Sequence, residues 1–210
     1  MAKKNRKSPF DILLELLGFK RRDDDESGYK EIDGSSASSN PGTDKGTGIG
    51  PFGSFSGKEG VTINDEILSE DLFRQAGRLY LGKGCGQNIS KAKELFERSS
   101  EMGNAKASYV LYKLRYQDAE KKKAALENLR NAANKKYCPA MYDLAIHFLY
   151  GDDVEKDTEM AVRMLQECAE HGHTGAISKL YYLFSAGSEV KRDKEKAEIY
   201  RSMLRTAKNG

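Results

Sequence analysis

The most regular pattern of apolar and polar positions in the chain runs from Ala140 to His173. Its first half places apolar residues on one face of an α-helix, and Gly151 ends that helix. Asp157 is a suitable N-cap for a second helix with its own apolar face. The stretch therefore predicts a helical hairpin, which needs neighbours to bury both faces. The apolar positions are Ala140, Leu144, Ala145 and Phe148 in the first helix, and Ala161, Met164, Leu165, Cys168 and Ala169 in the second.

Weaker copies of this hairpin lie on both sides of it. The small residues that open each second helix recur at intervals of 33, 36 and 36 residues, at Ala92, Ala125, Ala161 and Ala197. N-caps are predicted four positions earlier, at Asn88, Asp157 and Asp193. The second copy is three residues short and has Lys121 at that position, so Asp118 is its candidate cap.

The predicted folded domain covers residues 61–210 and opens with a capping box formed by Thr62 and Asp65. Hairpins that contact only their sequence neighbours stack into solenoids. We therefore expect an all-α solenoid of about four helical hairpins. The units are predicted at about residues 70–104, 105–138, 139–173 and 174–210.

The recurring positions resemble the Sel1-like repeats, a family related to the tetratricopeptide repeats. The resemblance covers about residues 70–205, and the third unit shows it best. It implies a right-handed α-solenoid that serves as a scaffold for protein complexes. Some members of the family have been described as binding or hydrolysing β-lactams, but there is no transferable catalytic motif to match here. The matching positions of the third unit are Ala140, Leu144, Ala145, Phe148, Gly151, Val154, Asp157, Ala161, Leu165, Cys168, Ala169, Gly172 and His173.

Another apolar segment lies within residues 1–22, where basic residues flank it on both sides. Ser8 and Pro9 predict the start of a short helix. Ten helical residues span only about 15 Å of a membrane core about 30 Å thick, so the helix cannot cross it. Asp11 and Glu15 interrupt the run, which argues against a secretory signal. The apolar residues of this predicted helix are Phe10, Ile12, Leu13, Leu14, Leu16, Leu17 and Phe19.

This N-terminal helix is expected to dock onto protein, either its own solenoid, a second copy or a partner. Attachment to a membrane surface is the alternative, because the basic flanks suit anionic lipid although the polar strip carries acids. Residues 23–60 are rich in Gly and Ser and predict a flexible linker. A G-x-G-x-x-G string at Gly48 to Gly53 lies in this linker without a following helix, so we expect no nucleotide site there.

The charge balance and the cysteine content argue against some classes of protein. The chain has 35 basic and 32 acidic residues, a net charge of +3, and this balance gives no reason to expect nucleic-acid binding. Three widely spaced cysteines predict no disulfide framework and favour a reducing, cytoplasmic location. Membrane association through residues 1–22 is the alternative left open by their basic flanks. Cys85 aligns with Val154 and Val190 and is expected to be a buried loop residue.

Candidate chemistry is sparse. Cys168, His171 and His173 lie close together, but a structural zinc site needs four ligands and no fourth is adjacent. His147 is expected to face outward, with no acid or nucleophile beside it. We therefore predict no metal, no cofactor, no small-molecule substrate and no catalytic residue.

The first helices of the hairpins are expected to line a concave groove that binds a partner. Positions two before, two after and five after the aligned leucine should point into it. Tyrosine suits such a surface because it combines apolar area with a hydroxyl. The alternative is that several of these residues are half-buried between hairpins. The predicted groove residues are Tyr109, Lys113, Tyr116, Tyr142, Ile146, Leu149 and Tyr182.

The sequence therefore predicts a non-enzymatic adaptor that binds a peptide or helix of another protein, with the N-terminal helix as a second docking element. One alternative is an immunity-type or regulatory inhibitor that caps a single enzyme or toxin. An inhibitor would form one stoichiometric complex, whereas an adaptor would join two proteins through separate sites. Another alternative, a hydrolase of the β-lactam-binding kind, would need a deep pocket with titratable groups.

Overall fold

The computed structural model describes residues 19–21, 29–31 and 63–209. The predicted N-terminal helix from Phe10 to Leu17, most of the linker, and Thr62 of the capping box lie outside the described residues. Phe19, the last apolar residue predicted for that helix, instead lies in a strand, β1 (Phe19–Arg21), which pairs antiparallel with β2 (Tyr29–Glu31). A three-residue strand leaves no periodic signal, so the sequence did not predict this pair.

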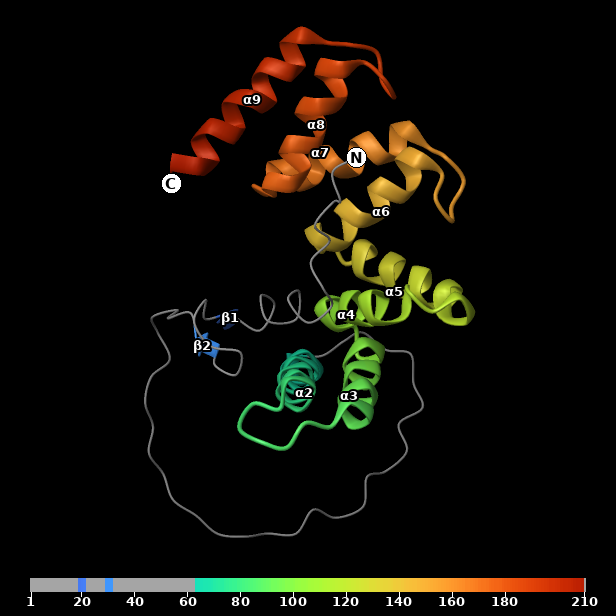
Figure 1. Ribbon diagram of the computed structural model, residues 1–210, viewed down its shortest axis with the longest axis vertical. Helices are drawn as coiled ribbons and strands as arrows, with labels where there is room; N and C mark the ends of the chain where they lie inside the picture. Colours follow the sequence, from blue (N-terminus) through green and yellow to red (C-terminus); the bar gives the residue numbers. More distant parts are fainter. Residues whose placement is uncertain (1–18, 22–28, 32–62, 210) are drawn as a thin grey trace.

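Helices account for nearly all of the described chain after residue 62, and they form four antiparallel hairpins stacked in chain order (Figure 1). Hairpin partners are α2 with α3, α4 with α5, α6 with α7, and α8 with α9. We call α2, α4, α6 and α8 the first helices and the others the second helices. The bounds are α2 (Ile63–Leu81), α3 (Ile89–Glu101), α4 (Ala105–Arg115), α5 (Lys122–Asn134), α6 (Cys138–Tyr150), α7 (Thr158–Glu170), α8 (Thr174–Ala186) and α9 (Lys194–Asn209).

The predicted caps form where the spacing placed them. The Asn88 and Asp157 side chains accept hydrogen bonds from the backbone N–H groups three residues later, at 3.0 and 2.8 Å. Asp193 does the same for the N–H of Lys196 at 3.0 Å. In the short second hairpin, Asp118 caps a 3₁₀ turn, η1 (Ala119–Lys121), that leads into α5. Each of these carboxylates and amides satisfies a helix N–H group that has no partner within the helix.

Glycine ends the first helices of the last two hairpins. Gly151 and Gly187 have φ of 73° and 72°, the left-handed conformation that side chains with a Cβ disfavour. A Cβ at Gly187 would lie 2.8 Å from the Cβ of Arg192, so the returning loop also needs the missing side chain. These two turns fix how the chain reverses from α6 into α7 and from α8 into α9.

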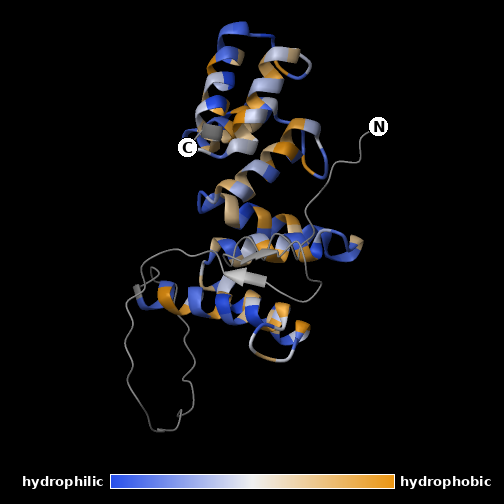
Figure 2. Cartoon of the chain, turned by 60° about the vertical axis from the view of Figure 1, so that its left-hand side comes forward, coloured by the Kyte–Doolittle hydropathy of each residue, from blue (hydrophilic) through white to orange (hydrophobic). Residues whose placement is uncertain are grey.

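Small and branched apolar residues are buried between the helices. Figure 2 shows that hydrophobic positions recur along the helices of all four hairpins. Ala92, Ala125 and Ala161, which opened the predicted second helices, have no exposed surface. Small residues at these positions allow close contact between helices, and Leu129 and Leu165 fill the space beside them. The all-α solenoid predicted from the repeat pattern is therefore confirmed for the described hairpins.

Two predictions about single residues are wrong. Cys85 is exposed rather than buried, because its thiol lies toward the carbonyl of Lys83 at 3.7 Å instead of entering the loop interior. His147 is buried rather than outward-facing, with 7% of its surface exposed. Within the described residues, no helix is both long and apolar enough to cross a membrane.

Candidate partner-binding surface

The carboxylate of Asp143 joins the first helices α4 and α6. Asp143 on α6 accepts a hydrogen bond from the Tyr109 hydroxyl at 3.0 Å and pairs with the Lys113 ammonium at 2.5 Å. Tyr109 is 6% exposed, and its burial, together with the negative charge of Asp143, raises the pKa of its phenol. Both Tyr109 and Lys113 were predicted groove residues. Their polar atoms instead join two neighbouring hairpins.

A second set of polar contacts lies further along the same two hairpins. The Tyr116 hydroxyl donates to Asp153 at 2.8 Å, and Lys122 pairs with the same carboxylate at 2.6 Å. These contacts lower the pKa of Asp153, with the hydrogen bond from Lys122 contributing most. Tyr116, another predicted groove residue, is therefore held in an inter-hairpin contact, as the alternative interpretation of these tyrosines expected.

His147 lies beside these tyrosines. Its Nδ1 is 2.7 Å from the carbonyl oxygen of Asp152, which can only accept, so Nδ1 carries the proton. Its Nε2 then accepts from the Tyr112 hydroxyl at 3.1 Å. Both ring nitrogens are satisfied, which explains why a polar residue is buried at a position expected to face solvent.

The next step of the solenoid, from α6 to α8, differs in its surface. Tyr142 and Ile146 of α6 are partly exposed, and Tyr150 and Tyr182 expose 42% and 56% of their surface. Lys179 of α8 connects the two more exposed rings: its Nζ lies 2.6 Å from the Tyr150 hydroxyl, 4.8 Å from the Tyr150 ring centre and 5.6 Å from that of Tyr182. We call Tyr142, Ile146, Tyr150, Lys179 and Tyr182 the tyrosine patch.

Tyr142 is held in place from one side. Its ring lies 5.2 Å from that of His173, the residue that caps α8 by accepting the N–H of Ala176 at Nδ1, 3.1 Å away. Gly175 leaves room for this packing, because a Cβ there would lie 3.1 Å from the His173 ring. Burial, followed by the charge of Asp143, raises the pKa of the Tyr142 phenol, so its hydroxyl remains a hydrogen-bond donor.

The predicted groove residues thus divide into two groups. Tyr142, Ile146 and Tyr182 lie in the tyrosine patch, whereas the others are in contacts between hairpins or in the core. Leu149 has no exposed surface, because it lies one helical turn after the buried Ala145 on the core face of α6. The structure adds two residues that the sequence analysis missed, Tyr150 and Lys179. Tyr150 follows Ile146 by four residues, a spacing that places both on one face of a helix and that would have indicated it.

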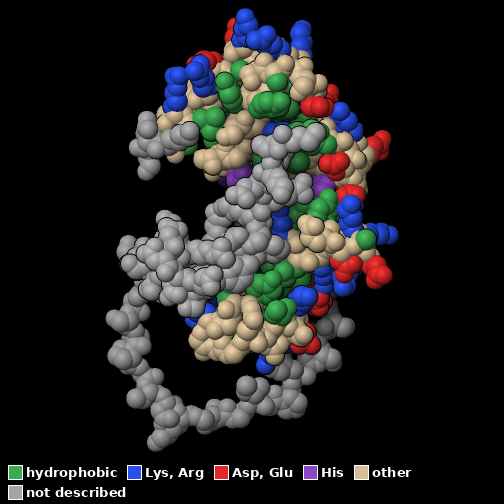
Figure 3. Space-filling model, in the orientation of Figure 1, with side chains coloured by type: hydrophobic (Ala, Val, Ile, Leu, Met, Phe, Trp, Pro, Cys, Tyr) green, Lys and Arg blue, Asp and Glu red, His purple; other side chains and the backbone are tan. Residues whose placement is uncertain are grey.

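The surface of the C-terminal hairpins carries both apolar and basic side chains. In Figure 3, hydrophobic side chains are visible over this end of the solenoid, with lysine and arginine side chains around its edge. Exposed aromatic side chains beside a charged rim are typical of sites that bind another protein.

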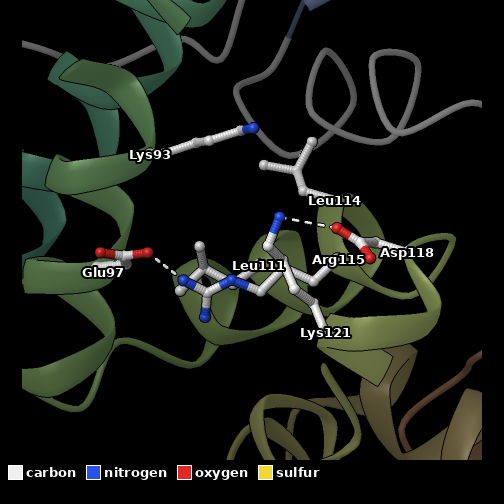
Figure 4. Close-up of a pocket in the computed structure, with 7 residues that line it drawn as sticks. All are labelled: Lys93, Glu97, Leu111, Leu114, Arg115, Asp118 and Lys121. Atoms are coloured by element: carbon white, nitrogen blue, oxygen red, sulfur yellow. Dashed lines mark hydrogen bonds and ion pairs between the residues drawn. The ribbon is translucent and has the colours of Figure 1, made fainter. Parts of the chain in front are cut away.

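A cavity of about 200 Å³ lies elsewhere, between α3, α4 and η1 (Figure 4). Charged side chains line most of it, and they are largely paired: Arg115 with Glu97, and Lys121 with Asp118 at 2.7 Å. Ligand sites are generally larger and more apolar. This cavity is therefore a weaker candidate for binding than the tyrosine patch.

Two of the three residues considered as zinc ligands, Cys168 and His173, have structural roles. Cys168 is buried, and burial raises the pKa of its thiol to about 12, so it is a poor nucleophile and metal ligand. His173 caps a helix, and burial lowers its pKa below the usual value. In the part of the chain that the structure describes, no three His, Cys, Asp or Glu side chains are arranged to hold a metal ion.

Comparison with known families agrees with the repeat pattern. Residues 74–104, 138–173 and 176–200 match the model of the Sel1 repeat. The chain contains three Sel1 repeats. The matched segments leave out residues 105–137, where the hairpin of α4 and α5 has no glycine in its loop. Sel1 repeat proteins generally mediate protein–protein interaction, and their fold is typically a non-enzymatic scaffold.

A solved structure shows the same fold. A Sel1 repeat protein from Oxalobacter formigenes aligns with a TM-score of 0.60 and 23% identity, over 70% of this chain and 60% of that one. The chain thus spans 60% of the length of that relative. A protective antigen from uropathogenic Escherichia coli strains, which displays an SLR fold, aligns with a TM-score of 0.44 and 23% identity, over 65% of this chain and 38% of that one. No curated protein sequence matches the chain.

Proposed function

We propose that this protein is a non-enzymatic adaptor that binds a segment of another protein on the tyrosine patch. The observation that carries the proposal is the contrast between the two steps of the solenoid. Between α4 and α6, the Asp143 carboxylate accepts a hydrogen bond from the Tyr109 hydroxyl and forms an ion pair with the Lys113 ammonium. Between α6 and α8, no carboxylate of the described residues makes the corresponding contacts. The Tyr150 and Tyr182 rings remain exposed there.

Aromatic residues at such a surface contribute strongly to binding. Tyrosine has few rotatable bonds, so fixing it in a complex costs little entropy while it buries a large apolar area. Tyr142 is already packed against His173, and Tyr182 lies under the Lys179 ammonium. A partner segment would therefore meet rings whose positions are partly fixed, which reduces the cost of ordering them.

The N-terminal residues complete the adaptor proposal. The apolar residues between Phe10 and Leu17 are proposed as a second docking element, on the strength of their sequence pattern. Because β1 pairs with β2 (Tyr29–Glu31), the proposed linker is shorter than the sequence alone predicts, and residues 32–60 would allow this element to act at a distance of roughly 30 Å from the solenoid. The three unbridged cysteines support a reducing compartment such as the cytoplasm for the protein.

The test is quantitative affinity capture with the full chain and with a Tyr142→Ala/Tyr182→Ala variant. Removing true anchors should weaken binding by at least tenfold each, so partners should be lost from the variant. Ile199→Ala is a matched control, because Ile199 of α9 exposes 56% of its surface, as Tyr182 does. If the double variant retains every partner that the parent and the control bind, the tyrosine patch is not the binding site. A parallel chain that starts at Gly60 shows which partners require the N-terminal residues.

A further inference from the structure

Lys179 occupies the position in α8 that Asp143 occupies in α6. Both residues directly precede the aligned leucines, Leu180 and Leu144. Asp143 faces a tyrosine and a lysine of the preceding first helix and pairs with both. Lys179 faces the tyrosines Tyr150 and Tyr182 instead. The sign of the charge at this repeat position is therefore reversed between the two steps.

The reversed charge is not balanced within the described chain. Other lysines at contacts between hairpins have carboxylate partners: Lys113 with Asp143 at 2.5 Å, Lys122 with Asp153 at 2.6 Å, and Lys136 with Glu167 at 2.6 Å. Lys156 likewise pairs with Glu189 at 2.8 Å. For Lys179, the described residues provide only the Tyr150 hydroxyl and two aromatic faces.

A partner that covers the tyrosine patch must satisfy this ammonium group. An ammonium has three donors, and the Tyr150 hydroxyl takes one of them. Removing water from the remaining two without supplying an acceptor is costly, because a buried charge without a partner is strongly unfavourable. A carboxylate satisfies them with charge-assisted hydrogen bonds, which are stronger than neutral ones.

We propose that the tyrosine patch binds an acidic peptide segment, in which an Asp or Glu side chain pairs with Lys179 and flanking apolar side chains pack on Tyr142, Ile146 and Tyr182. This inference rests on the proposed function and adds the chemistry of the partner. A single lysine among aromatic rings suits one carboxylate in an apolar sequence. It does not suit a polyanion such as nucleic acid, which needs an extended row of basic residues.

The test uses random twelve-residue peptides displayed by their C-termini on phage and selected on the immobilised full chain. The display blocks the peptide C-terminus, so only side chains supply carboxylates. We expect selected peptides to combine Asp or Glu with apolar residues. Synthesised peptides should bind Lys179→Glu at least tenfold more weakly than the parent by fluorescence anisotropy, and Lys179→Arg should retain binding. Selection on Lys179→Glu should instead enrich Lys and Arg.

The control is Lys135→Glu, which introduces the same charge change at an exposed lysine that ends α5. It should bind the peptides as the parent does. If selected peptides require Tyr142 and Tyr182 but show no acidic enrichment and bind Lys179→Glu equally well, the acidic-partner inference is overturned and the binding surface stands. If no selected peptide depends on Tyr142 and Tyr182, the proposed function itself fails.

Discussion

Replacing Asp143 with alanine should loosen the contact between the second and third hairpins. Asp143 is the only described acceptor shown for the Tyr109 hydroxyl, and it also pairs with Lys113. The substitution leaves a hydroxyl without its partner on a tyrosine that is only 6% exposed. In a repeat protein, where each hairpin contacts only its neighbours, the loss acts directly on the coupling between repeats.

The expected loss of unfolding free energy follows from the hydrogen bond to Tyr109 and the ion pair with Lys113. Leaving a buried hydroxyl unsatisfied costs about 1–3 kcal/mol. The ion pair adds up to about 1 kcal/mol, because the Lys113 and Asp143 side chains keep 24% and 20% of their surface exposed. Together, Asp143→Ala should lower the free energy of unfolding by roughly 1–4 kcal/mol. That is a large part of the 5–15 kcal/mol typical of a folded domain.

The assay is urea denaturation followed by circular dichroism, combined with a double-mutant cycle to Tyr109→Phe. Phenylalanine removes the hydroxyl, so Tyr109→Phe should cost little or nothing once Asp143 is already alanine. Asp152→Ala is the control, since its exposed side chain makes no ion pair within the described residues. A cost below about 0.5 kcal/mol for Asp143→Ala, or fully additive costs in the cycle, would show that these contacts do not couple the two hairpins.

Two further predictions concern single positions. Burial lowers the pKa of His173 in the folded state below its usual 6.5, so the folded state binds fewer protons than the unfolded state, and stability should fall as pH drops below 6.5 towards that lowered pKa. His173→Asn keeps a capping side chain, as Asn104 does for α4, and should flatten this part of a stability–pH curve. Gly187→Ala should cost roughly 1–2 kcal/mol in thermal or urea unfolding. Gly86→Ala, where no atom lies within 4 Å of the added Cβ, should change stability by less than about 0.5 kcal/mol.

The helices and their stacking order were predictable because the repeat pattern follows directly from helix geometry. Alanine recurs at Ala92, Ala125 and Ala161 because helices approach closely there, and the structure buries all three completely. The caps at Asn88 and Asp157 have a short-range cause, a side chain that accepts an N–H three residues later. Such signals require no knowledge of how one hairpin is oriented on the next.

Contacts between hairpins were less predictable for the same reason. Tyr109 and Asp143 are 34 residues apart, and their meeting depends on the rotation between α4 and α6, which a helical period does not specify. The sequence therefore placed Tyr109 in a groove, whereas the structure buries it. His147 was expected at the surface because it is polar, but two hydrogen bonds from different elements satisfy it inside. The role of Lys179 could not be predicted from the sequence, because it depends on the two tyrosines beside it and on the lack of a carboxylate among its described neighbours.

Partners are proposed to bind on the first-helix surface of α6 and α8. The most direct measurement places a photo-crosslinking amino acid at position 182 or 199 of the full chain in cells, since Tyr182 and Ile199 are equally exposed at 56%. If partners bind there, position 182 forms a discrete adduct with a partner protein, Tyr142→Ala abolishes this adduct, and position 199 forms none with that partner. Equal adducts at both positions, or an adduct at position 182 that persists with Tyr142→Ala, would contradict this proposed binding site.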